Sequence, residues 1–80
     1  MLRLKEIKRE GNLLSAIYDP EATGILGRVC INIHTKSPED GVISKYENAE
    51  YPDYYYHALK ALRNIVNEDD IPAERLVMWY

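Results

Sequence analysis

The stretch that decides the fold is Asp53-Tyr-Tyr-Tyr-His-Ala-Leu-Lys-Ala-Leu-Arg-Asn-Ile-Val-Asn67. With about 100° of rotation per residue, its apolar side chains fall within an arc of roughly 120°, the width of one core-facing stripe. These side chains are Tyr55, Ala58, Leu59, Leu62, Ile65 and Val66, whereas His57, Lys60, Asn64 and Asn67 fall on the opposite side. The stretch therefore predicts one amphipathic helix that needs an apolar surface to pack against.

Both ends of this helix are marked in the sequence. Pro52 disfavours helical geometry at the residue before it, and the carboxylate of Asp53 is of the kind that caps a first turn. After Asn67 the apolar period stops, and Pro72 prevents the helix from continuing. The rest of the chain must therefore supply the surface that the helix covers, and its patterns are those of strands.

The first part of the chain predicts a β-hairpin. Residues 2–9 alternate apolar and charged side chains and then slip by one at Ile7, as a strand with a bulge or a frayed end would. Their charges are typical of an edge strand. Residues 11–12 form a turn signal, and residues 13–18 resume strand character.

Two registers of the hairpin remain open. A two-residue loop sets Ile7 opposite Ala16, whereas a three-residue loop sets Leu4 opposite Tyr18. Nothing in the local sequence decides between them.

Residues 25–34 carry the clearest two-residue period in the chain. Val29, Ile31 and Ile33 alternate with polar or small side chains, so we expect this apolar set to face the helix and the strand to be central. A weaker strand is expected at residues 42–46, and a final one at residues 75–80.

The predicted order of elements is β-β-β-(β)-α-β, in which the strand in parentheses is the weak one. We therefore expect an α+β fold, with a small, mostly antiparallel sheet and one amphipathic helix packed across one face. Eighty residues form a single domain, residues 1–80, whose core is marginal at this size.

Composition limits the classes of function. The net charge of −3 is mild, and the cations of the first strand are partly offset by Glu6 and Glu10, so nucleic-acid binding through that strand is only a weak alternative. The single Cys30 cannot form an internal disulfide, which favours a reducing, cytoplasmic location. No segment approaches the ~20 apolar residues of a membrane span, so we expect no membrane association.

One candidate site is a polar sheet face formed by Arg28, Asn32 and His34. Such a face can bind a small molecule or serve a small enzyme, although the solvated side of an antiparallel sheet looks the same. Cys30 and His34 do not form a catalytic pair, because four residues along a strand span about 13 Å. We expect Cys30 to be a structural thiol.

The sequence also contains seven tyrosines and no phenylalanine. Tyr46, Tyr51 and Tyr56 are candidates for a recognition patch, because tyrosine is enriched at interface hot spots. The alternative is a rim of rings that seals a small core.

The acidic run at residues 68–70 lacks the ligand pattern of a calcium loop and is expected to be a solvated segment. No catalytic, cofactor or metal motif is present, and no cofactor is expected.

The C-terminal strand favours a protein partner. Both of its alternating sets are apolar or aromatic, Leu76/Met78/Tyr80 on one face and Val77/Trp79 on the other. A single helix covers only one face, so the second cover must be another molecule or the connection at residues 47–53. The leading hypothesis is a non-enzymatic protein–protein interaction module that forms a homodimer through Val77 and Trp79.

Overall fold

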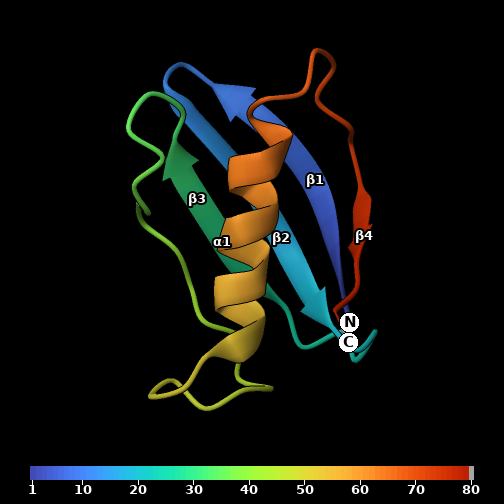
Figure 1. The fold of residues 1–80 in the computed structure, drawn as a ribbon. Coiled ribbons are helices and arrows are strands. Elements are labelled where there is room, and N and C mark those ends of the chain that lie inside the picture. Colours follow the sequence, from blue (N-terminus) through green and yellow to red (C-terminus); the bar gives the residue numbers. More distant parts are fainter. Residues whose placement is uncertain (80) are drawn as a thin grey trace.

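The computed structural model describes residues 1–79 and shows a four-stranded antiparallel sheet with one helix across it (Figure 1). The strands are β1 (Leu2–Glu10), β2 (Leu13–Pro20), β3 (Gly27–Asn32) and β4 (Arg75–Val77), and the helix is α1 (Asp53–Ile65). The order of strands in the sheet is β3-β2-β1-β4. The predicted α+β fold is confirmed.

The positions of the first and third strands were predicted wrongly. β1 is internal, because β4 returns along its free side and pairs Val77 with Leu2. β3 is an edge strand of the sheet. The alternation of side chains reports which face is buried but not which strands are neighbours, and this is why the prediction failed.

The outer edge of β3 is nevertheless covered. Isolated bridges join Ile31 to Pro38 and Arg28 to Val42, and Arg28 and Val42 exchange two backbone hydrogen bonds of 2.8 and 2.9 Å. The strand expected at residues 42–46 is absent, and only the bridge at Val42 remains of it.

The hairpin combines both predicted registers. Its loop has two residues, 11–12, with Glu10 opposite Leu13, yet Leu4 lies opposite Tyr18. The register shifts between Lys5 and Lys8, where Glu6 adopts a φ of 50° and the strand bulges. Leu4 and Ile7 are three residues apart and could not share a face of a regular strand, so the bulge is what brings both into the core.

The core lies between α1 and the sheet. The predicted helix stripe is confirmed, because Ala58, Leu59, Leu62 and Ile65 are buried and Tyr55 and Val66 pack beside them. The sheet contributes Leu2, Leu4, Ile7, Leu14, Ala16, Tyr18, Val29 and Ile31. Val29 and Ile31 face the helix as expected.

The start of α1 is capped by a different residue from the one expected. No side-chain cap comes from the N-cap residue Pro52 or from Asp53, which is the first residue of the helix. Instead the Glu47 carboxylate accepts hydrogen bonds from the backbone N–H groups of Tyr54 at 2.9 Å and Tyr55 at 3.1 Å.

Two elements are shorter than predicted. α1 ends at Ile65, before the predicted Asn67. β4 is likewise shorter than predicted, and Tyr80 lies outside the described residues.

Candidate functional site

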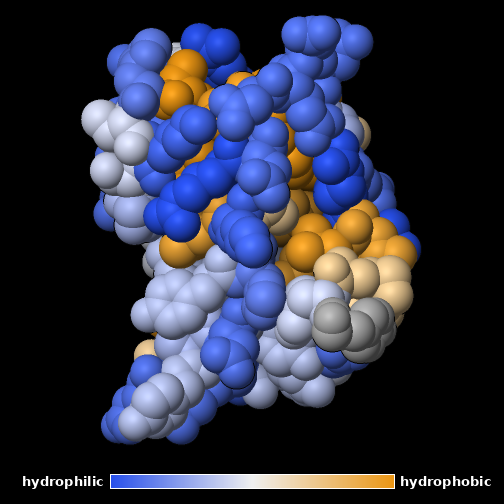
Figure 2. All heavy atoms as spheres, in the orientation of Figure 1, coloured by the Kyte–Doolittle hydropathy of each residue, from blue (hydrophilic) through white to orange (hydrophobic). Residues whose placement is uncertain are grey.

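A groove runs between α1 and β4 on the helix side of the sheet. One side of α1 contributes His57, Lys60, Ala61 and Asn64, whose spacing places them on one helical face. Two cavities of about 220 and 190 Å³ adjoin here and share Ala61, Asn64, Val77 and Met78 as lining residues. Figure 2 shows hydrophobic residues gathered beside α1 on the side of β4. The face of the helix predicted to be solvated therefore lines a groove.

Ala61 lines both cavities where β4 and its extension pass the helix. Val77 packs against the core as a half-buried residue, because its partner Leu2 faces α1. Leu76, opposite Arg3, alternates to the other side and is 42% exposed. Met78 is 56% exposed. The exposed apolar side chains of this segment are thus Leu76 and Met78 rather than Val77 and Trp79.

Trp79 is covered from within the chain. Its ring stacks on His57 with centroids 3.9 Å apart, and it meets the ring of Tyr54 edge-on at 5.4 Å. Tyr46 continues this row by an edge contact of 5.6 Å with Tyr54. The cover anticipated from residues 47–53 is supplied by α1 instead, and the aromatic row extends the groove.

The three candidate tyrosines do not form one patch around this row. Tyr46 belongs to it through Tyr54. Tyr56 is exposed and contacts Tyr55, and Tyr51 is exposed in the connection before α1. Only Tyr46 therefore shares a continuous aromatic surface with Trp79.

The outer edge of β4 is bare in the described part of the chain. β4 pairs with β1 on one side and, within residues 1–79, no strand pairs with its other side (Figure 1). A bidentate ion pair fixes the start of the strand, because the two terminal nitrogens of Arg75 lie 3.1 and 2.8 Å from the Glu68 carboxylate. The hydrogen bonds from Arg75 lower the pKa of Glu68.

The structure places Arg28, Asn32 and His34, the predicted polar sheet face, in three different surroundings. Arg28 lies on the sheet face away from α1, which we call the far face, and donates to the Asp40 carbonyl at 2.8 Å. The Asn32 side chain accepts hydrogen bonds from the backbone of His34 and Thr35 and so forms the turn after β3. His34 lies beyond the strand, with its Nε2 3.2 Å from the side-chain oxygen of Asn12.

Cys30 is buried on the far face, with 1% of its surface exposed. Burial raises the pKa of its thiol, which leaves less of the reactive thiolate at neutral pH. The nearby charges of Arg28 and Glu39 have smaller and opposite effects on this pKa. A structural role for Cys30 stays a prediction, and its burial agrees with that role.

Among residues 1–79, no group of His, Cys, Asp and Glu side chains is arranged to hold a metal ion. In the described part of the chain, the helix α1 is too short and too polar to cross a membrane. Comparisons with protein families, with characterised proteins and with solved structures find no match for the chain.

Part of this site could be predicted from the sequence. The spacing of His57, Lys60, Ala61 and Asn64 is that of a second helical face, and the small Ala61 at its centre was the available signal. The position of Glu47 carried no such signal, because its role depends on a loop that brings it to the start of α1.

Proposed function

We propose that this protein is a small, non-enzymatic interaction module that binds protein through β4 and the adjoining groove, and that its partner is a second copy of the same chain. One observation carries the proposal: the bare edge of β4 is flanked by the exposed side chains of Leu76 and Met78. The single buried Cys30 also supports a reducing, cytoplasmic location.

The contrast between the two edges of the sheet supports this surface. Residues 38–42 cover the outer edge of β3 through hydrogen bonds of 2.8–2.9 Å. The edge of β4 has no comparable cover within residues 1–79. An unpaired edge presents N–H and C=O groups that a further strand can satisfy, so natural proteins usually protect it with Lys, Pro or a bulge. Residues 75–79 contain neither Lys nor Pro, and Arg75 is already engaged by Glu68.

A second copy suits this edge better than an unrelated strand. Two β4 strands related by a twofold axis run antiparallel and continue the sheet across the interface. With Leu76 on the axis, Arg75 lies opposite Val77 of the second copy, so like charges do not face each other. The two Leu76 side chains would then lie next to each other and lose part of their exposure to water, which adds apolar burial to a domain of 80 residues with a small core.

Nucleic-acid binding is a weaker candidate function than protein binding, because the cations of the far face are largely paired with carboxylates. Three of its cations are paired, with distances of 3.9 Å for Arg3–Glu74, 3.5 Å for Lys5–Asp19 and 3.0 Å for Lys8–Glu10. A polyanion would have to compete with each of these carboxylates.

The proposal is tested by the mass of the protein in solution. Light scattering at micromolar concentration should give twice the chain mass of 9.3 kDa. The double variant Leu76→Lys/Met78→Lys should give the mass of one chain, because the lysine introduced at position 76 would face its copy on the axis and two apolar side chains would be lost from the interface. The matched control Leu26→Lys/Val42→Lys changes two exposed apolar residues outside β4 and should stay dimeric. A wild-type monomer at high concentration, or equal masses for the two double variants, would overturn the proposal.

A further inference from the structure

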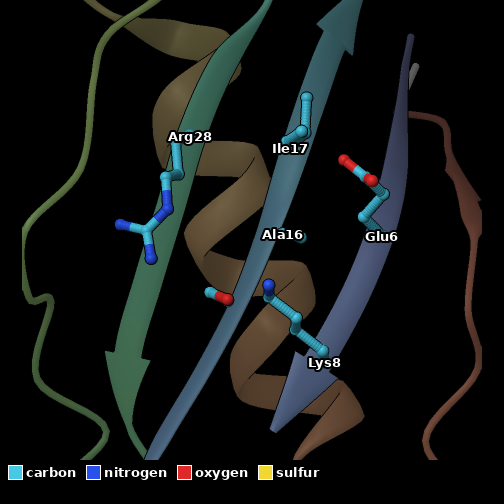
Figure 3. Close-up of a pocket in the computed structure, with 6 residues that line it drawn as sticks. Glu6, Lys8, Ala16, Ile17 and Arg28 are labelled. Carbon is cyan, nitrogen blue, oxygen red and sulfur yellow. The ribbon is translucent and has the colours of Figure 1, made fainter. Parts of the chain in front are cut away.

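The far face contains a cavity that lies outside the proposed interaction surface at β4. It has a volume of about 120 Å³ and is lined by Glu6, Lys8, Ser15, Ala16, Ile17 and Arg28 (Figure 3). These residues come from three adjacent strands, β1, β2 and β3. In Figure 3, α1 lies behind the sheet and the long side chains of Lys8 and Arg28 lie in front of it.

The strand register brings three hydrogen-bond donors together here. Lys8 lies directly opposite Ser15, and Arg28 lies opposite Ile17, two residues further along β2. Directly opposite residues have Cβ atoms about 5 Å apart and diagonal ones about 7–8 Å, within reach of Lys and Arg side chains. Ser15 is 7% exposed, so its hydroxyl belongs to the floor of the cavity rather than to the rim.

Arg28 has donors to spare. Its guanidinium gives one hydrogen bond to the Asp40 carbonyl, and among residues 1–79 it forms no ion pair with a carboxylate. A guanidinium has five N–H donors in a planar fork that matches carboxylate and phosphate oxygens. Arg28 therefore combines a positive charge with free donors at the side of the cavity.

Two carboxylates compete with an anion at this position. Glu10 pairs with Lys8 at 3.0 Å, but both side chains are exposed, and exposed pairs contribute little stability and exchange readily. Glu6 also lines the cavity, and Figure 3 shows its carboxylate directed toward Ile17 while the Lys8 side chain extends toward β2. A small anion between Lys8 and Arg28 can avoid Glu6, whereas a long polyanion cannot.

We propose that this cavity binds a small oxyanion, such as the phosphate or carboxylate group of a metabolite. Arg28 and Lys8 hold its charge from two sides, and the Ser15 hydroxyl donates a hydrogen bond from below. The site is separate from the proposed interaction surface at β4, because β4 forms one edge of the sheet and the cavity lies across β1, β2 and β3.

The test follows backbone amide signals by NMR while inorganic phosphate, sulfate or acetate is added at constant ionic strength with chloride as the balancing anion. Saturable shifts should appear at Ser15, Ile17 and Arg28. Arg28→Ala should weaken binding by at least about tenfold, because a charge-assisted hydrogen bond contributes about 1.5–3 kcal/mol. Lys60→Ala removes a cation from α1 and should bind as the wild type does.

The choice of anion identifies the chemistry. Saturation by phosphate and sulfate alone assigns a phosphate-like ligand, and saturation by acetate assigns a carboxylate. Arg28 is exposed, so Arg28→Ala should keep the dispersed spectrum of the folded protein, and Lys8→Ala provides a second variant that should also weaken binding. Linear, unsaturable shifts for all three anions, or wild-type affinity in both variants, would overturn the proposal.

Discussion

Glu47 links three parts of the chain through one carboxylate. It accepts hydrogen bonds from the backbone N–H groups of Tyr54 and Tyr55 at the start of α1 and from the Tyr18 hydroxyl of β2 at 2.6 Å. The same hydroxyl accepts a hydrogen bond from the Ser44 N–H at 2.7 Å. One side chain thus caps the helix and fixes it to the sheet, a role for which the sequence offered Asp53 instead.

Replacing Glu47 should therefore destabilise the fold. We expect Glu47→Ala to lower the free energy of unfolding by about 2–3 kcal/mol, because it removes a helix cap and leaves the buried Tyr18 hydroxyl without its acceptor. Urea unfolding measures the difference. Glu50→Ala changes an exposed carboxylate in the same connection and should have little effect. Equal losses in the two variants would show that Glu47 is not the cap.

Two tyrosines should make the fold sensitive to alkali. A hydrogen bond to Glu21 at 2.8 Å, with burial, raises the pKa of Tyr54 to about 12. Burial, and then the hydrogen bond to Glu47, raises the pKa of Tyr18 well above its usual range. Both hydroxyls therefore stay protonated in the folded state at a pH where the unfolded chain, with a tyrosine pKa near ~10, releases its protons.

The stability that these two groups contribute is complete below about pH 10 and is lost as the pH rises toward 12. Unfolding midpoints measured from pH 8 to 12 should fall across the upper part of this range. The fall should be shallower in Tyr54→Phe, which cannot ionise. A midpoint that stays constant to pH 12, or an unchanged slope in the variant, would contradict the assignment.

At the scale of elements, α1 is the main anchor of the core. Leu62 is fully buried at the centre of its apolar stripe, and large-to-small changes at such sites cost about 2–5 kcal/mol. That loss is comparable to the whole stability of a small domain, so Leu62→Ala should leave much of the protein unfolded at room temperature. Lys60→Ala, on the groove side of the helix, should change the thermal midpoint little. Equal effects on the midpoint would mean that the buried face is assigned wrongly.

Local patterns predicted the elements better than their arrangement. The helix stripe and the core face of β3 could be read from periodicity alone, because burial repeats every 3.6 or two residues. The place of β1 inside the sheet could not, since it depends on β4, which lies some seventy residues later in the chain. The bulge at Glu6 was visible as a slip in the pattern, but only the structure shows that it reconciles a two-residue loop with Leu4 opposite Tyr18.

The candidate site shows the same division. The apolar character of residues 75–79 was clear from the sequence, but which of them stay exposed depends on the side of β4 that α1 covers. His57 and Tyr54 cover Trp79, and Val77 packs against the core beside its partner Leu2. Leu76 and Met78 are therefore the apolar residues of this segment that stay exposed. The far-face cavity was missed because Lys8, Ser15 and Arg28 come from three strands whose register the sequence left open.

At the scale of the whole molecule, the helix covers one face of the sheet, residues 38–42 cover one edge, and the other edge ends at β4 (Figure 1). The proposed association closes that remaining edge with the same segment of a second chain. It also leaves the far-face cavity open, since the cavity lies across β1, β2 and β3. One chain could therefore pair with its copy and bind an anion at the same time.

The most direct measurement is an isotope-filtered NOE experiment on an equimolar mixture of labelled and unlabelled protein, which detects only contacts between different chains. The proposed twofold pairing predicts signals between Leu76 of one chain and the β4 segment of the other, with further signals from Met78. Two results would contradict the proposal that β4 is the interaction surface. One is intermolecular signals confined to other exposed residues, such as Tyr51 or Leu26. The other is the absence of intermolecular signals at a high concentration where light scattering shows the mass of a single chain.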